Sequence, residues 1–107
     1  MAYVKKQLNA LNAILGPIDI PEDKTACATL QYPSGGTGTL VLEAIVQGMD
    51  EAVAANWVTL TMKKNDGTDV LLLAALGLGS ADCWAYGKVR ARMSVVGDCT
   101  PSLAIAS

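Results

Sequence analysis

The sequence predicts an all-β protein: a single antiparallel β-sandwich of jelly-roll or immunoglobulin-like type, with about six to eight short strands. Three observations predict this fold. Apolar and polar residues alternate with period two in several short stretches, Gly- and Asp-rich turns separate these stretches, and no interior segment has a convincing helical period. The 107 residues suffice for one domain with its own hydrophobic core.

Residues 1–24 differ from the rest, and we expect them to form an N-terminal arm in front of a sandwich domain at residues 25–107. Apolar residues recur in this arm at helical spacing, namely Val4, Leu8, Leu11 and Leu15. The prolines of the stretch AILGPIDIPEDK favour extended chain instead. The pattern leaves a short helix, a strand and an extended arm all open.

Period-two alternation predicts the strands of the sandwich. The expected strands are TACATLQY (25–32), TLVLEAIVQ (39–47), WVTLTMKK (57–64), TDVLLLAAL (68–76), KVRARMSVV (88–96) and SLAIAS (102–107). GLGSAD (77–82) is expected to be a loop, and GMDEAVAAN (48–56) a connection with one helical turn. The residues expected to face the core are Ala26, Ala28, Leu30, Leu40, Leu42, Ala44, Val46, Val58, Leu60, Met62, Val89, Ala91, Met93 and Val95.

Charge and composition argue against several classes of protein. The net charge of −2 and the isoelectric point near 4.8 disfavour a nucleic-acid binder, whose binding face is strongly basic. No signal peptide is expected, and the apolar run VLLLAALGLG is about half as long as a membrane span. We therefore expect a protein that is made in a reducing cytoplasm and has neither a nucleic-acid nor a membrane partner.

The cysteines, Cys27, Cys83 and Cys99, fit reduced structural thiols better than a metal site, because the chain has no CxxC pair and no histidine. A disulfide between Cys83 and Cys99 stays open, since the sequence does not show whether they are close. The lack of histidine also excludes Ser–His and Cys–His catalysis. The glycine-rich stretches SGGTG and GLGSAD lack the spacing of a phosphate-binding loop. We expect no enzyme, no metal and no cofactor.

A basic row marks the expected strand at residues 88–96. Lys88, Arg90 and Arg92 occupy alternate positions, so they face outward while the apolar set faces the core. Such a row is typical of a solvent-facing sheet in which a neighbouring strand supplies opposite charge, and Glu43 is the candidate partner. Because arginine is enriched at protein interfaces, we expect this row to bind an acidic protein surface rather than nucleic acid.

The aromatic residues Trp57, Trp84 and Tyr86 have two interpretations. In a glycan-binding sandwich, such rings stack on sugars. In a chain without phenylalanine, they fill the interior of a core that is otherwise built from small residues. The second interpretation is favoured.

The order of three segments resembles a β-sandwich domain that is frequent in virion proteins of tailed bacteriophages. The segments are GTGTLVLEAIVQG, NWVTLTMKKNDGT and WAYGKVRARMSVVGDCTPSLAIAS, and the resemblance covers residues 25–107. Members of this family carry a G-T-x-x-x-E strand, a strand that opens at Trp, and a closing G-Y-x-K-V-R-x-R strand. Here the closing motif begins with Tyr86 and Gly87 in reversed order, and GMDEAVAAN replaces a compact Asp-Gly turn before Trp57.

The resemblance implies a non-enzymatic structural role in the virion, as a capsid decoration (cement) protein or as part of the tail or its fibres. A single small domain with an arm fits a decoration protein that binds the major capsid protein and copies of itself. The alternative is a tail or fibre module that binds a glycan receptor. The expected partner-binding residues are Tyr3, Lys5, Lys6, Trp57, Trp84, Arg90 and Arg92.

Overall fold

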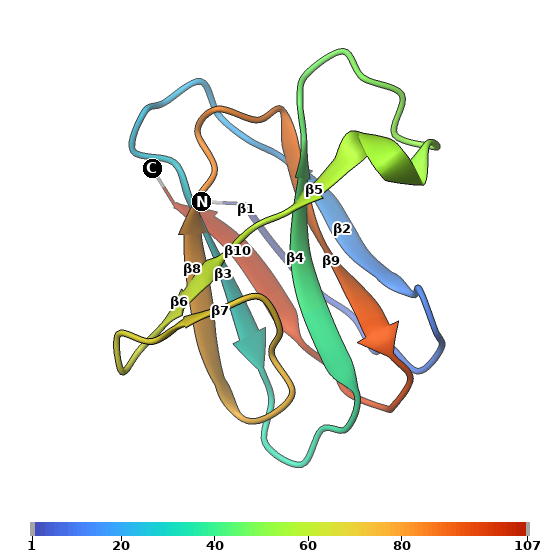
Figure 1. The fold of residues 1–107 in the computed structure, drawn as a ribbon. Helices are drawn as coiled ribbons and strands as arrows, with labels where there is room; N and C mark the ends of the chain where they lie inside the picture. Colours follow the sequence, from blue (N-terminus) through green and yellow to red (C-terminus); the bar gives the residue numbers. More distant parts are fainter. Residues whose placement is uncertain (1, 107) are drawn as a thin grey trace.

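A computed structural model describes residues 2–106 as two antiparallel β-sheets that pack face to face (Figure 1). The six-stranded sheet has the order β1 (Ala2–Lys5), β10 (Ser102–Ala106), β3 (Cys27–Tyr32), β8 (Gly77–Asp82), β6 (Met62–Lys64) and β7 (Asp69–Val70). The four-stranded sheet has the order β2 (Ile14–Asp19), β9 (Lys88–Val95), β4 (Thr39–Ile45) and β5 (Trp57–Thr59). The predicted all-β antiparallel sandwich is confirmed, with ten strands in the described residues.

The core lies between the sheets and contains the inward-facing residues of the long strands. Leu30 of β3, Leu42 of β4, Ala91 of β9 and Leu103 of β10 are fully buried. Removing each leucine side chain from water contributes roughly 2 kcal/mol to folding, so these rows hold the two sheets together. Some residues that the pattern places inward are instead about half exposed, because they lie on an edge strand or at strand ends: Val46, Val58 and Val95.

The N-terminal segment belongs to both sheets and is not a separate arm. β1 pairs with β10, and β2 pairs with β9. Leu8 and Leu15 are buried in the core, which holds the segment in place. The expected division at residue 24 is therefore wrong. Leu8 and Leu15 share a helical spacing in the sequence, but both face the core from extended chain. Gly16 and Pro17 interrupt β2 with a register shift, which an edge strand tolerates because proline's missing N–H breaks no ladder bond there.

Residues 57–64 form two strands in different sheets. β5 extends the four-stranded sheet beside β4, and β6 joins the six-stranded sheet beside β8. Leu60 and Thr61 carry the chain across, and the Leu60 N–H donates to the Leu42 carbonyl at 2.8 Å. Leu60 and Met62 are both buried, so the apolar alternation continues through the crossover. The sequence pattern therefore does not show that one strand ends and another begins here. Ahead of β5, the 3₁₀ turn η1 (Ala54–Asn56) confirms the helical turn expected in the connection at 48–56.

The expected strand at 68–76 is wrong. Only Asp69 and Val70 form β7, and the chain continues as a connection with Leu71 and Leu72 exposed. Leu73 alone turns into the core, and its backbone exchanges two hydrogen bonds with Leu40 of β4, at 2.8 and 2.9 Å.

The expected loop at 77–82 is also wrong, because GLGSAD forms β8 between β3 and β6. Gly79 explains why a glycine-rich stretch serves as a strand here. A Cβ at Gly79 would lie 2.8 Å from the Met62 Sδ and 3.1 Å from a Leu73 methyl carbon. Neighbouring side chains fill the space beside this position, so any larger residue would have to displace them.

The cysteines are free thiols, and Cys83 and Cys99 lie at opposite ends of β3. The Cys83 N–H donates to the Ala26 carbonyl at 3.1 Å, just before β3, whereas Cys99 lies beside Tyr32 at its end. The length of β3 separates them by about 17 Å, while the Cα atoms of a disulfide are less than about 7 Å apart. These two cysteines therefore do not pair.

Leu15→Ala should lower the free energy of unfolding by about 2–5 kcal/mol, because it leaves a cavity in the core. Leu11→Ala is the matched control in the same segment: Leu11 is 60% exposed, and its truncation should change stability by less than about 0.5 kcal/mol. Urea denaturation measures both variants. Equally small effects would show that the segment is a dispensable arm after all.

Alkaline pH should destabilise the protein through its buried thiols. Burial raises the pKa of Cys83 from 9.0 to about 11, and it also raises the pKa values of Cys27 and Cys99. Unfolded thiols therefore ionise before folded ones, and stability should fall as the pH rises from about 9 to about 11. Urea denaturation across this range should show a shallower decline for Cys83→Ala than for the wild type. Parallel declines would contradict a role of this thiol.

Candidate interaction surface

The outer face of the four-stranded sheet carries a row of charged side chains along β4 and β9. Alternation turns Leu42 and Ala91 inward and turns Glu43, Arg90 and Arg92 outward. The antiparallel register places Glu43 directly opposite Arg90. Arg92, two residues further along β9, lies diagonally across from the same carboxylate, within reach of a long side chain.

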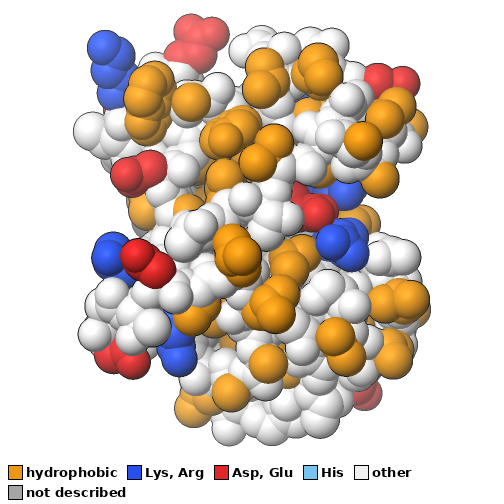
Figure 2. Space-filling model, viewed as in Figure 1, with side chains coloured by type: hydrophobic (Ala, Val, Ile, Leu, Met, Phe, Trp, Pro, Cys, Tyr) orange, Lys and Arg blue, Asp and Glu red, His pale blue; other side chains and the backbone are white. Residues whose placement is uncertain are grey.

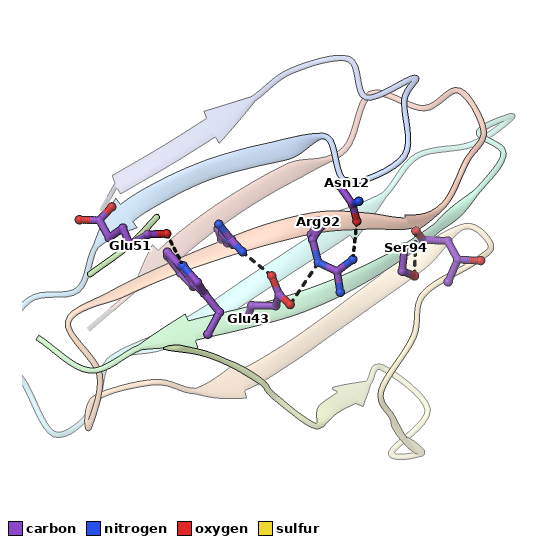
Figure 3. A network of polar contacts seen from close by, with 8 residues as sticks. Asn12, Glu43, Glu51, Arg92 and Ser94 are labelled. Atoms are coloured by element: carbon purple, nitrogen blue, oxygen red, sulfur yellow. Dashed lines mark hydrogen bonds and ion pairs between the residues drawn. The ribbon is translucent and has the colours of Figure 1, made fainter. Parts of the chain in front are cut away.

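Glu43 is buried although it faces outward, with only 5% of its surface exposed. Its Oε1 accepts a hydrogen bond from the Arg90 Nε–H at 3.0 Å, and its Oε2 accepts one from the Arg92 Nε–H at 3.2 Å. Arg92 also donates through Nη1 to the Asn12 Oδ1 at 2.9 Å (Figure 3). The prediction that Glu43 is the partner of the basic row is confirmed for Arg90 and Arg92, whereas Lys88 pairs with other acids. Both carboxylate oxygens are paired, which a buried charge requires.

Trp57 covers this network from the edge of the sheet. The Arg90 guanidinium carbon lies 3.9 Å from the centre of the Trp57 ring, a cation–π contact. The indole N–H donates to the Glu51 carbonyl at 2.9 Å, and the residue is only 7% exposed. Trp57 is therefore no accessible ring for a partner. Trp57 is buried, but it packs on the outer face of one sheet and not in the core between the sheets, so the favoured interpretation is wrong about its place. It is wrong for Trp84 too, which is 51% exposed.

Lys88 ties the connection between β4 and β5 to the sheet. Its Nζ lies 2.9 Å from the Glu51 Oε2 and 3.6 Å from the Asp19 Oδ1. The hydrogen bond to Glu51 raises the pKa of Lys88. Glu51 thus binds Lys88 through its carboxylate and Trp57 through its carbonyl, and these two contacts tie the connection between β4 and β5 to the sheet.

Gly87 lets three connections meet at one end of the sandwich. Its N–H donates to the Ile45 carbonyl at 2.8 Å, and its carbonyl accepts from the Ile20 N–H at 2.9 Å. A Cβ at Gly87 would lie 2.8 Å from the Gln47 Cα, so any side chain would push the β4–β5 connection away. This glycine of the closing motif therefore serves a close approach of backbones.

Two shallow hollows lie on either side of Glu51. The arginine hollow lies over the basic row and has a volume of about 510 Å³; its lining residues are Asn12, Ile14, Glu43, Glu51, Ala52, Ala54, Arg90 and Arg92. The loop hollow, of about 340 Å³, lies where the connections meet; its lining residues are Asp19, Ile20, Glu22, Ile45, Val46, Gln47, Gly48, Met49, Glu51, Gly87 and Lys88. The first presents N–H donors, and the second combines apolar walls with a largely acidic rim.

The other predicted contact residues are exposed, but none of them lines either hollow. Tyr3 and Lys5 lie on β1 in the six-stranded sheet, and Lys6 follows them. Trp84 is 51% exposed in the connection between β8 and β9. Of the predicted contact residues, the structure brings together only Trp57 and the two arginines.

Sequence reasoning missed an exposed apolar surface, which we call the leucine patch. It consists of Leu71, Leu72 and Leu76 in the connection between β7 and β8, each more than half exposed. Figure 2 shows hydrophobic side chains at many places on this face, including its middle, where Figure 1 places the β5–β6 crossover and this connection. The apolar run at residues 70–76 was the sequence signal for this patch, but a run of this length is equally typical of a buried strand.

Within residues 2–106, no group of three or more His, Cys, Asp or Glu side chains is placed to hold a metal ion. The same residues contain no helix with the length and hydropathy needed to cross a membrane.

Glu43→Gln should lower the free energy of unfolding by about 3–5 kcal/mol, because two largely buried guanidinium groups lose their carboxylate. Glu51→Gln is the control, since it breaks a more exposed ion pair and keeps the carbonyl that binds Trp57, and its effect should be much smaller. Thermal unfolding of both variants measures the difference. Similar small effects would show that the Glu43 network is only a surface feature.

The sequence matches no known protein family, and it matches no curated protein. Among solved structures, the SPBc2 prophage-derived protein YomS superimposes with a TM-score of 0.65 and 13% sequence identity, covering 99% of this chain and 96% of that one. A chain from the disulfide-linked pili of Bacillus endospore appendages gives a TM-score of 0.35 and 14% identity, covering 99% of this chain and 87% of that one. The likeness to YomS shows a shared fold along the whole chain.

Proposed function

We propose that the protein is a non-enzymatic structural protein of a tailed-bacteriophage virion, and specifically a capsid decoration protein that binds the major shell protein and stabilises the shell. The observation that carries this proposal is the whole-length likeness to a prophage-derived protein. It supports a phage association, and the resemblance of residues 25–107 to virion sandwich domains supports the structural role. Neither nucleic acid nor a membrane is a partner in this proposal.

Exposed surfaces of two kinds support binding to another protein. The leucine patch presents large apolar side chains to solvent on a single connection, which is typical of interaction sites. The arginine hollow presents directed N–H donors on a rigid sheet. Apolar contact and oriented polar contact together are the usual composition of a protein interface.

Attachment through preformed faces replaces attachment through an arm. The N-terminal segment is paired in both sheets, so it does not extend to a neighbouring molecule's sheet. Binding by rigid faces loses little conformational entropy. A protein that binds the assembled lattice and not its free subunits stabilises the lattice by mass action. Copies side by side on a lattice also contact one another, which is the homo-oligomeric contact that we propose.

A glycan-binding module of the tail or its fibres is the second candidate function. Trp84 favours it, because its ring is 51% exposed and free to stack on a sugar. The other two aromatic residues do not help: Trp57 is buried, and Tyr86 is half-buried against the core. A single exposed ring is a small platform, so we rank this function second.

The protein should co-sediment stoichiometrically with purified heads of the phage or prophage that encodes it, and should raise the temperature at which those heads release DNA. The double variant Leu71→Asp/Leu72→Asp should weaken this binding at least about tenfold, because it places charges in an apolar contact. Leu11→Asp is the matched control, since Leu11 is equally exposed but lies outside the leucine patch.

No co-sedimentation with heads, combined with saturable binding to host surface glycans that Trp84→Ala abolishes, would replace the decoration role with the receptor-binding one. Co-sedimentation that both aspartate variants retain would keep the decoration role but move its contact away from the leucine patch.

A further inference from the structure

We propose that the arginine hollow is the docking site for a carboxylate, carried by an aspartate or glutamate side chain of the partner protein. This inference rests on the proposed function, because it assumes that the partner is a protein of the virion. It adds the chemistry by which that partner is recognised.

The arginines have N–H groups to spare. The hydrogen bonds of Arg90 use its Nε–H alone, and Arg92 uses its Nε–H and one Nη1–H. A guanidinium group has five N–H donors. Within residues 2–106, no protein group accepts a hydrogen bond from the remaining donors of these two side chains, and both residues line the hollow. Guanidinium donors match the two oxygens of a carboxylate in a fixed geometry.

The same contacts that occupy the Nε–H groups hold the free donors in position. Glu43 fixes both guanidinium groups from below, Trp57 stacks on Arg90, and Asn12 holds the end of Arg92 (Figure 3). An arriving carboxylate therefore orders few rotamers, so little side-chain entropy is lost.

The charge balance of the hollow also favours an anion. Glu43 faces two arginines, and Glu51, the other acid in the lining, is neutralised by Lys88 at 2.9 Å. Asp19 also approaches Lys88, at 3.6 Å, but its side chain is 87% exposed, where water screens it, and it lines the other hollow. One positive charge thus remains uncompensated over Arg90 and Arg92.

The walls favour a short side chain over a sugar. Ile14, Ala52 and Ala54 are small or aliphatic, as the stem of an aspartate or glutamate requires. Trp57, the aromatic residue next to the hollow, stacks on Arg90 and is only 7% exposed, so it offers no free ring face to a sugar. The observations therefore select an acidic protein segment.

The test titrates the full chain with a hexaglutamate peptide, and with hexaglutamine as the uncharged control, while NMR follows the arginine Nε–H signals. Hexaglutamate should shift the signals of Arg90 and Arg92, and hexaglutamine should not. Ala54→Glu should weaken hexaglutamate binding at least about fivefold, because it places a carboxylate in the hollow, whereas Ala54→Gln should not. Ala54 is exposed, so neither change removes a core contact.

Equal responses to the two peptides, or equal affinities of the two Ala54 variants, would overturn the inference. Binding of an acidic polysaccharide in the hollow without binding of hexaglutamate would also overturn it, in favour of a glycan ligand. Co-sedimentation separates this failure from that of the proposed function. Heads that bind Ala54→Glu as well as wild type would refute the hollow but keep the decoration role. If heads bind neither the wild type nor Ala54→Glu, while the wild type still binds hexaglutamate, the decoration role is refuted and the carboxylate site is kept.

Discussion

The buried carboxylate of Glu43 is the constraint around which the four-stranded sheet is built. Its neighbours on the same face of β4, Val41 and Ile45, are buried too, so the charge lies in an apolar strip. A carboxylate in such a place must be neutralised. β9 supplies two arginines, Trp57 covers the nearer one, and the connection that carries Glu51 closes over the strip. Both hollows lie beside this connection, and Glu51 lines both of them.

The sequence predicted the strands whose two faces differ clearly. β3, β9 and β10 alternate between buried and more exposed residues, and the register of β4 with β9 puts Glu43 opposite Arg90 as the charges suggest. It failed where tertiary packing overrides the local pattern. The glycine-rich β8 is a strand through its pairing with β3 and β6, and Met62 and Leu73 fill the space beside Gly79; all these contacts come from other parts of the chain. The N-terminal segment failed for a similar reason, since only its partners β9 and β10 show that it is extended.

The candidate site was predictable in its charges but not in its shape. Alternation alone placed Arg90 and Arg92 outward and suggested Glu43 as their partner. Trp57 is buried because the connection that carries Glu51 packs against it. No periodicity in the sequence describes the course of that connection, so the burial of Trp57 could not be predicted. The leucine patch was hidden for the opposite reason, because an exposed apolar run has the same composition as a buried strand.

The pairing of β1 with β10 has a consequence for the folding of the six-stranded sheet. Ala2 lies opposite Ile105 and Lys5 opposite Ser102, while β10 also pairs with β3 on its other side. The first strand of the described chain therefore has its hydrogen-bonded neighbour in the last strand, β10, with all the other strands between them in the sequence. Contacts so distant in sequence form slowly, because a long loop must close before they contribute. Until β10 is in place, β1 lacks its partner in the sheet and β3 presents one unpaired edge, so both strands depend on β10.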